Sequence, residues 1–224
     1  MKLYTHPVST VCRPVAFFAA DAGITLEETI VDILTGEQYG EAYVKVNPSN
    51  AVPVLEDGSF RMTESSAILK YLAEKSRSPA YPADVQARAR INEVMNWCNT
   101  SLYRTFGYGL VYPQILEPYQ LPDASAQKLL VKAGEASARR YLGIMNDHWL
   151  GGGSGYLAGP EITIADYFAS GIISLGEVIG CTFADWPNVA AWYERMKARP
   201  NWQATNGAVF GWAEAMKDQD FVRV

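Results

Sequence analysis

Two short segments of the chain carry residues whose types and spacing suit the binding of a peptide. A valine–proline pair, Val52-Pro53, enters an extended run, and the bond before a proline is the only peptide bond that becomes cis at modest cost. In that form we expect the Val52 main chain to face outward, where its N–H and C=O can pair with an extended peptide. Glu64-Ser65 opens a predicted helix, whose N-terminus attracts a carboxylate. The two segments together predict a peptide clamp.

The elements that must hold this clamp fall within the first 76 residues. We expect strands at 3–5, 27–31, 52–55 and 59–62, with Asp57-Gly58 as the turn between the last two. We expect helices at 11–22, 37–46 and 65–76, and Gly23 ends the first of them. The order βαβαββα, with a right-handed βαβ unit joined to an antiparallel hairpin, is typical of a thioredoxin-like α/β domain.

The rest of the chain predicts helices alone. The segment Arg77 to Pro82 reads as an exposed linker, and beyond it apolar residues recur at helical spacing with no series of strands. Thr163, with Asp166 three residues later, predicts a capping box at a helix start. We therefore expect a thioredoxin-like domain at 1–77, a linker at 78–83 and an all-helical domain at 84–224.

Composition excludes several classes of function. The net charge of −5 argues against a nucleic-acid partner, and no apolar run approaches the length needed to cross a membrane. The cysteines Cys12, Cys98 and Cys181 are too few and too widely spaced for a disulfide framework or a zinc site. We expect a cytoplasmic protein with no metal, since a reducing compartment suits free cysteines.

The order of these segments resembles the glutathione S-transferase family over essentially the whole chain. Val52-Pro53 is similar to its cis-proline segment, and the run from Thr63 to Ile68 is similar to its glutamyl-binding motif. Leu157-Ala158-Gly159 followed by Thr163 to Asp166 is similar to its C-terminal capping signature. The resemblance implies glutathione as co-substrate, a small electrophile as second substrate, a role in detoxification and a homodimer.

The segment from Pro7 to Val15 is most similar to the theta-like classes and to bacterial dehalogenase relatives. Those classes use a serine as the thiol activator, and the matching position is Ser9. The resemblance also implies the remaining contacts. The residues expected to bind glutathione are Gln38 at the glycyl end, Val52 and Pro53 at the cysteinyl unit, Glu64 at the ammonium and Ser65 at the carboxylate. Those expected to line the electrophile pocket are Tyr103, Phe106, Tyr108 and Trp212.

Energetics support the role of Ser9. A free thiol has a pKa near about 8.5, so only a few per cent is ionised at neutral pH. A hydrogen bond to a charged group contributes roughly 1.5–3 kcal/mol, and a helix N-terminus adds up to about 2 kcal/mol. Together these effects lower the pKa of the thiol by roughly two to three, which favours the thiolate at pH 7. The serine stabilises the anion and does not lose its own proton.

Several readings of this segment stay open. Ser9 could be only a helix cap, and Thr10 is its nearest rival for the sulfur. Cys12 stands in a Ser-x-x-Cys element, where a structural or tuning role is favoured over a redox role. Arg13 could raise the local positive potential or form a surface salt bridge.

Two other functions and two departures from the family pattern accompany this interpretation. The alternatives are a binding module that keeps the fold without catalysis, and a glutathione-dependent thiol reductase that acts through Cys12. Theta relatives often have a basic residue where Ala51 stands, and an acid where Thr100 stands. Both departures predict weaker glutathione binding or a shift of the contacts to other groups.

Overall fold

A four-stranded mixed sheet forms the base of the first half of the computed structural model, which covers residues 1–224. Its strands are β1 (Lys2–Thr5), β2 (Glu27–Ile30), β3 (Val54–Asp57) and β4 (Phe60–Thr63), in the order β2-β1-β3-β4. β1 runs parallel to β2 and antiparallel to β3, and β3 runs antiparallel to β4. Gly58 turns the hairpin with a φ of 62°, a region that favours glycine. The predicted thioredoxin-like sheet is confirmed.

Helices make up the rest of the fold. The first half contains α1 (Arg13–Asp21), a 3-10 turn (Glu37–Tyr39), α2 (Glu41–Val44) and α3 (Ser65–Lys75). The second half contains α4 (Val85–Trp97), a π-helix (Cys98–Val111), α5 (Tyr112–Ile115), a 3-10 turn (Glu117–Tyr119), α6 (Ala124–Ile144), a second π-helix (Met145–Trp149), α7 (Ile164–Ile173), α8 (Leu175–Val178), α9 (Pro187–Lys197) and α10 (Trp202–Met216). This is the thioredoxin-like plus all-helical arrangement that the sequence predicts.

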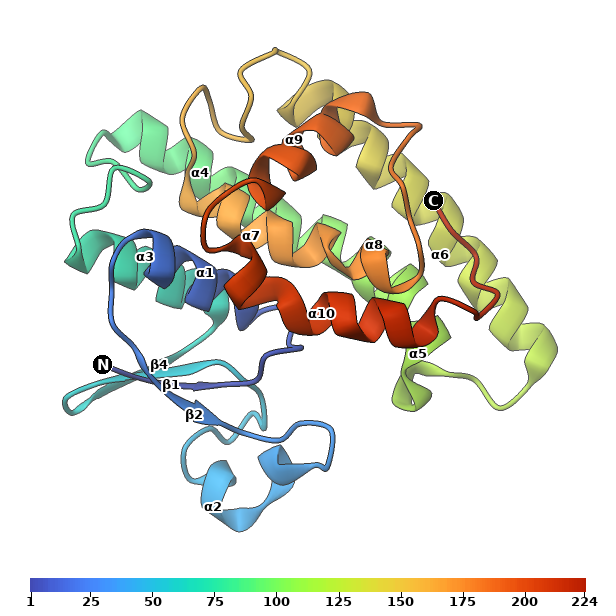
Figure 1. The fold of residues 1–224 in the computed structure, drawn as a ribbon, viewed down its shortest axis with the longest axis horizontal. Helices are drawn as coiled ribbons and strands as arrows, with labels where there is room; N and C mark the ends of the chain where they lie inside the picture. Colours follow the sequence, from blue (N-terminus) through green and yellow to red (C-terminus); the bar gives the residue numbers. More distant parts are fainter.

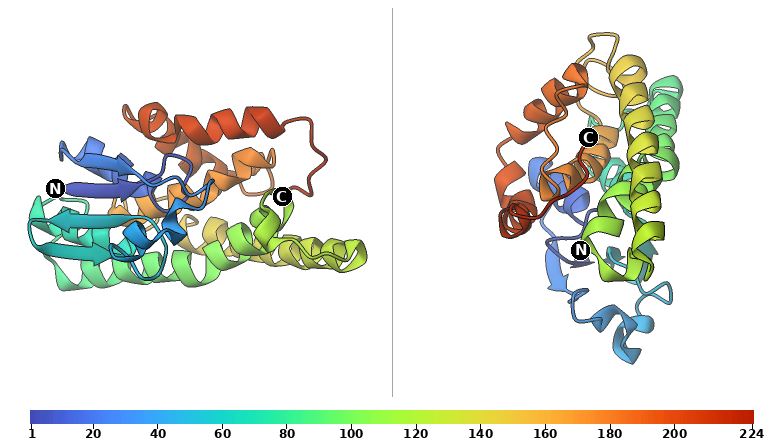
Figure 2. Two further views of the ribbon diagram at one scale, coloured as in Figure 1. Left: turned by 90° about the horizontal axis from the view of Figure 1, so that it is seen from below. Right: turned by 90° about the vertical axis from the view of Figure 1, so that its right-hand side faces the viewer.

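The two halves are packed side by side through α1 and α3. These helices lie on the side of the sheet that faces the helical half, and α2 lies on the opposite side (Figure 1). Every residue of α7 is buried, and α7 contacts α1, α3, α4 and α9. α10 and α6 lie on opposite sides of the helical half (Figure 2). No helix is long and apolar enough to cross a membrane.

Some element boundaries differ from the prediction. β3 begins at Val54 instead of residue 52, because Pro53 has no N–H to donate to the sheet. The helix expected at 37–46 is divided at Gly40, whose ψ of 147° is extended. α10 and both π-helices were not predicted. α10 contains Gly207 and Gly211, which are poor helix formers, so its formation depends on packing of its buried residues such as Trp202.

One hydrophobic core of 44 buried residues runs through both halves. It includes Leu3 and Leu55 from the sheet, Phe17 from α1 and Trp192 from α9. A second, smaller cluster consists of Cys12, Val31, Tyr43, Val52 and Val54. Because Val52 packs in this cluster, the cluster holds the Val52-Pro53 segment of the predicted clamp in place.

The predicted capping box at the start of α7 is confirmed. Asp166 is fully buried, and its Oδ2 accepts hydrogen bonds from the Thr163 N–H at 2.8 Å and the Thr163 hydroxyl at 2.9 Å. Its Oδ1 accepts from the Leu157 N–H and the Trp192 Nε1–H, both at 2.9 Å. One carboxylate therefore ties α7 to the preceding loop and to α9.

Candidate functional site

A cleft of about 240 Å³ opens between the β1–α1 loop, the segment before β3, the first π-helix and α10. Apolar and aromatic side chains form most of its wall. Its lining residues are Val8, Ser9, Thr10, Val11, Ile33, Leu34, Gln38, Asn50, Ala51, Val52, Tyr103, Tyr108, Tyr112, Leu116, Tyr119 and Trp212. The predicted residues Ser9, Gln38, Val52, Tyr108 and Trp212 thus come from distant parts of the chain to one cavity.

A second compartment of about 250 Å³ adjoins the cleft. It is lined by Pro53, Glu64 and Ser65, and also by Asn99 from the π-helix. The two compartments share lining residues, namely Val11, Ala51, Val52, Tyr103 and Tyr108. They therefore form one continuous site, in which the start of α3 lies beside the Val52 main chain.

Ser9 lies in the turn that leads into α1, and only 8% of it is exposed. Its Oγ accepts a hydrogen bond from the Cys12 N–H at 3.4 Å. A hydroxyl carries two lone pairs and one proton, so this bond uses a lone pair and leaves the proton free to donate. Ser9 can therefore both cap the start of α1, by accepting with a lone pair, and donate its proton to a ligand.

Thr10, the rival hydroxyl, is engaged elsewhere. Its Oγ1 lies 2.8 Å from the hydroxyl of Tyr112, which in turn lies 2.6 Å from the hydroxyl of Tyr103. All three residues are buried. The Ser9 hydroxyl, in contrast, is engaged only with neighbouring Cys12, from whose N–H it accepts a hydrogen bond. Geometry therefore favours Ser9 over Thr10 as the free donor in the cleft.

The main chain at Val52 is open to a ligand. The Val52–Pro53 bond is cis, as the resemblance to the cis-proline segment implies. The Val52 N–H and C=O form no hydrogen bond within the chain, whereas the carbonyl of neighbouring Ala51 accepts from the Tyr43 hydroxyl at 2.8 Å and from Asn47 Nδ2 at 2.7 Å. Buried main-chain groups without partners are rare in folded proteins, so this pair suits an incoming peptide.

Two buried side-chain oxygens in the cleft also lack partners. They are Oε1 of Gln38 and Oδ1 of Asn50. Gln38 was predicted for the site, and its Nε2 donates to the Ile33 carbonyl at 3.4 Å. Asn50 was missed, although its φ of 54° is a backbone conformation that asparagine tolerates better than most residues. An acceptor-rich wall of this kind suits a ligand that carries N–H donors.

Glu64 has the other unusual backbone of the site. It precedes α3 with a φ of 68°, where residues other than glycine are strained, and such strain is concentrated at functional sites. Ser65 follows it as the first residue of α3 and is buried. The first N–H groups of a helix lack intrahelical partners, so this corner of the second compartment can receive a carboxylate.

Three predicted residues, Cys12, Phe106 and Arg13, line neither compartment of the site. Cys12 is fully buried in the smaller core cluster, and burial raises the pKa of its thiol. Phe106, expected in the electrophile pocket, is fully buried with its ring 6.0 Å from that of Phe183, so that expectation is wrong.

The surface salt bridge considered for Arg13 is also wrong. This side chain is buried, and it donates to Ser174 Oγ and Asn206 Oδ1, both at 2.7 Å, and to the Gly171 carbonyl at 3.3 Å. Burial lowers the pKa of its guanidinium. No carboxylate pairs with it, and its Nε has no partner. Arg13 therefore joins the start of α1 to α7 and α10 through neutral acceptors alone.

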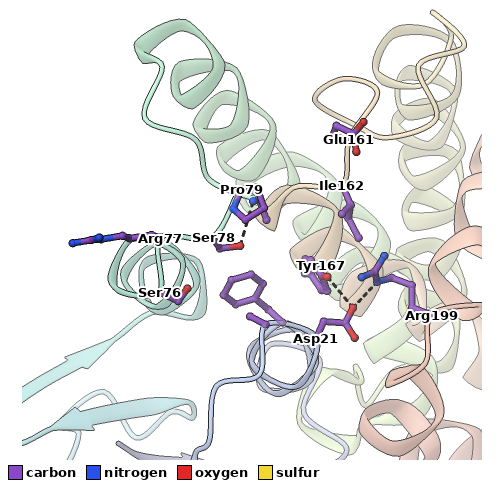
Figure 3. A pocket seen from close by; sticks show the side chains of 12 residues that line it. Asp21, Ser76, Arg77, Ser78, Pro79, Glu161, Ile162, Tyr167 and Arg199 are labelled. Carbon is purple, nitrogen blue, oxygen red and sulfur yellow. Dashed lines mark hydrogen bonds and ion pairs between the residues drawn. The ribbon is translucent and has the colours of Figure 1, made fainter.

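A separate cavity of about 410 Å³ lies where the two halves meet, away from the cleft residues (Figure 3). Asp21 at its floor accepts from the Tyr167 hydroxyl at 2.8 Å, from the Arg199 guanidinium and from Asn201 Nδ2 at 2.8 Å. Its buried charge is thus already satisfied by the fold. No group of three or more His, Cys, Asp or Glu side chains is placed to hold a metal ion anywhere in the chain.

Comparison with known proteins gives a consistent result. The family profile of the glutathione S-transferase N-terminal domain matches residues 3–80, and that of the C-terminal domain matches residues 111–200. Human glutathione S-transferase theta-1 is 35% identical over 201 residues, which span 88% of this chain and 82% of the human protein. Human glutathione S-transferase theta-2 is also 35% identical over 201 residues, with 88% and 81% covered.

Solved structures agree. The structure of human glutathione transferase theta-2 in complex with glutathione and an unknown ligand superposes with a TM-score of 0.85 at 30% identity, covering 100% of this chain and 93% of that chain. The apo form of human glutathione-S-transferase T1-1 superposes with a TM-score of 0.82 at 32% identity, covering 95% and 90%.

Proposed function

Since this chain belongs to the glutathione S-transferase family, we propose that its cleft binds glutathione, ionises the thiol and directs the thiolate at a small electrophile. Glutathione is a co-substrate here, because its sulfur ends in the product. The compartment at the start of α3 holds the γ-glutamyl end, and the cleft beside Ser9 holds the sulfur and the electrophile.

The contacts follow from the unpaired groups of the site. The Val52 N–H and C=O pair with the cysteinyl unit, beside Pro53. Glu64 meets the γ-glutamyl ammonium, and Ser65 at the start of α3 meets its carboxylate. Gln38 contacts the glycyl end, where its free Oε1 accepts a hydrogen bond from the glycyl amide N–H. These assignments give hydrogen-bond partners to the Val52 main chain, to Gln38 Oε1 and to the first N–H groups of α3, which have none in the folded chain.

The reaction uses Ser9 as an anion stabiliser. Its free proton donates to the sulfur, which lowers the pKa of the thiol because a hydrogen bond favours the charged form. The thiol proton leaves to solvent, the sulfur lone pair forms a C–S bond, and a halide or similar group departs with its bonding electrons, or the sulfur adds to an activated double bond. The cleft then releases the conjugate.

The observation that carries this proposal is the concentration of unpaired polar groups in one cavity. Gln38 and Asn50 have buried side-chain oxygens without partners, and the Val52 main chain forms no hydrogen bond within the chain. All three residues line the cavity that also contains the Ser9 hydroxyl. A protein that kept the fold only as a scaffold would gain nothing from these open groups, because each costs stability while it is unpaired.

Titration calorimetry with glutathione, followed by turnover of a panel of aryl and alkyl halides, tests the proposal. We expect saturable binding of glutathione and glutathione-dependent release of halide. Absence of binding would point to a scaffold. A thiol reductase that acts through Cys12 is disfavoured, because that thiol is buried, lies outside the cleft and has a raised pKa.

We also propose that the chain is a cytoplasmic homodimer with a role in detoxification, and that its domains meet across a linker at 78–83. The free cysteines suit a reducing compartment. Phe60 on the edge strand β4 is 50% exposed, and Val85 at the start of α4 is also exposed, as side chains covered by a partner would be in a single chain. Sedimentation of the native protein and of Phe60→Ser tests the dimer, and we expect the variant to dissociate more readily.

A further inference from the structure

A positive charge is buried at the start of α1, one helical turn after Ser9. The Arg13 side chain lies inside the protein, since the residue is only 2% exposed, and the Arg13 N–H donates to the Ser9 carbonyl at 3.2 Å. Burial lowers the pKa of its guanidinium, yet an arginine keeps its proton in proteins. The turn that carries the candidate thiol activator is therefore followed directly by a full unit charge in the interior.

The acceptors around this guanidinium are all neutral. They are Ser174 Oγ and Asn206 Oδ1, both at 2.7 Å, and the Gly171 carbonyl at 3.3 Å. The Arg13 Nε has no partner, and no carboxylate forms an ion pair with the side chain. Hydrogen bonds to neutral groups offset only part of the hydration that a buried charge loses. An anion bound nearby would offset the remainder.

The titratable side chains that act on the Arg13 charge are themselves uncharged at neutral pH. They are the phenols of Tyr193, Tyr112 and Tyr103 and the thiol of Cys12. Burial raises the pKa of each of these four groups, so each keeps its proton. The folded chain therefore provides no negative charge among them to cancel the field of Arg13.

A small cavity of about 100 Å³ beside Arg13 contains two further titratable side chains, His6 and Glu28. The Nδ1 of His6 accepts a hydrogen bond from the Val8 N–H at 3.4 Å, which occupies it within its own loop. Glu28 lies on β2 and is exposed, so water screens its charge. Neither group neutralises the buried guanidinium.

Gly171 on α7 brings this charge and the activating turn to one place. Its carbonyl accepts from the Arg13 guanidinium, and a Cβ on Gly171 would lie 2.5 Å from the Thr10 carbonyl oxygen. The Thr10 hydroxyl meets that of Tyr112, and both residues line the cleft together with Ser9. Burial raises the pKa of Tyr112, and the Arg13 charge is among the influences that oppose this rise. The field of Arg13 thus reaches the wall of the cleft.

We propose, on the basis of the proposed glutathione transferase function, that the Arg13 guanidinium is the buried counter-charge of the glutathione thiolate and acts across the Ser9–Thr10 turn. Arg13 lines neither compartment and does not touch the sulfur, so it is a positioning residue and not a catalytic one. It sets the electrostatic potential in which the Ser9 hydroxyl donates to the sulfur. The thiolate in turn supplies the negative charge that the folded chain lacks around Arg13.

Coulomb's law gives the sign and the size of the effect. A positive charge favours the anion, so Arg13 lowers the pKa of the bound thiol, and loss of its charge raises that pKa. Two unit charges on the order of 10 Å apart, at an effective dielectric constant of about 20, change a pKa by about 1. Salt should weaken this interaction little, because the guanidinium is buried.

The variant Asn206→Asp tests the proposal with Arg13 still in place. It puts a carboxylate where Asn206 Oδ1 accepts from the guanidinium at 2.7 Å, and the new ion pair should cancel most of the field of Arg13. We expect the pKa of the bound thiol to rise by about 1. The pKa is read from the ultraviolet absorbance of the thiolate against pH, with S-methylglutathione, which has no thiol, as the blank. Below both pKa values, kcat/KM for a benzyl halide should fall about 3- to 10-fold.

Asn206→Ala is the matched control, because it removes the same hydrogen bond to Arg13 and adds no charge. The pKa of the bound thiol should then stay within about 0.3 of the wild-type value. Equal values in Asn206→Asp and Asn206→Ala would overturn the inference, because a purely structural role would affect both variants alike.

A second pair of variants decides the question if substitution of Asn206 prevents folding, which circular dichroism would show. Arg13→Met should raise the pKa of the bound thiol by about 1, whereas Arg13→Lys, which keeps the charge, should restore most of the wild-type value. An unchanged pKa in folded Arg13→Met would also overturn the inference. Failure of the wild-type protein to bind glutathione would instead refute the proposed function.

Discussion

Two regions of this molecule bury polar groups, and they treat them in opposite ways. At the start of α7, both carboxylate oxygens of Asp166 accept hydrogen bonds from the fold, including those of Thr163 and Trp192. In the cleft, the Val52 main chain, Gln38 Oε1 and Asn50 Oδ1 have no partner at all. The first region is complete when the chain folds, whereas the second keeps polar groups open for the glutathione that we propose it binds.

The contrast separates stability from function. A buried polar group without a partner costs about 1–3 kcal/mol, so a fold retains such groups only where something offsets the cost. At Asp166 the hydrogen bonds offset the cost of burying the carboxylate and connect α7 to the preceding loop and to α9. In the cleft the proposed binding of a peptide with complementary donors would offset this cost. Substitutions in the two regions should therefore have different signatures.

The largest effect is expected at the completed region. Asp166→Ala removes one acceptor group and leaves the Thr163 and Leu157 N–H groups and the Trp192 Nε1–H buried without partners. We expect the free energy of unfolding to fall by about 3–5 kcal/mol, as measured by denaturant titration. Asp166→Asn, which keeps one acceptor, should lose less. Equal stability of Asp166→Ala and the wild-type protein would contradict this account.

Next in size is Ser9→Ala, which should affect catalysis and spare the fold. Loss of the hydrogen bond to the sulfur should lower turnover at neutral pH about 10- to 100-fold. The deficit should shrink as the pH rises, because the thiol then ionises without help, so the apparent pKa in the kcat/KM profile moves up toward about 8.5. Thr10→Val is the matched control. A larger loss there would transfer the role to Thr10.

A smaller effect distinguishes the two regions most directly. Gln38→Met keeps a similar side-chain length while it removes the unpaired Oε1. KM for glutathione should rise about 5- to 10-fold, since one neutral contact is lost. Stability should change by less than about 1 kcal/mol, because the only bond to the fold that is lost is the long one of 3.4 Å from Gln38 Nε2 to the Ile33 carbonyl. A marked loss of stability would mean that Gln38 serves the fold.

The smallest effect is expected for Cys12→Ala. The Cys12 side chain lies in the core cluster below the cleft and does not line it. Halide turnover should therefore stay within about twofold of the wild-type rate. A glutathione-dependent disulfide reduction assay is run in parallel. Loss of reductase activity in this variant alone would restore the cysteine mechanism.

Much of the fold was predictable from the sequence because local signals agree with the global structure. Asp57-Gly58 marks the hairpin turn, and Thr163 with Asp166 marks the start of α7. The cis bond at Val52-Pro53 agrees with the resemblance of this pair to the cis-proline segment of the family. The residues expected to bind glutathione lie around one cavity with Ser9, and their individual roles stay predictions.

Features that depend on packing were not predictable in the same way. The π-helix has no sequence signal of its own, so Phe106 was expected in the pocket although it faces the core. Asn50 carries an unpaired acceptor only because of its place in the cleft. The unpaired state of a side chain is a property of the folded surroundings, and a linear pattern does not reveal it.

The buried guanidinium of Arg13 has a consequence for protein engineering. It reaches from the segment after Ser9 to Ser174 and Asn206, deep in the helical half. A chimera that grafts a foreign C-terminal half onto this N-terminal half must therefore supply matching oxygens, or strand a positive charge in an apolar interior. Arg13 and its acceptors Ser174 and Asn206 therefore have to be exchanged together if a chimera across this interface is to fold.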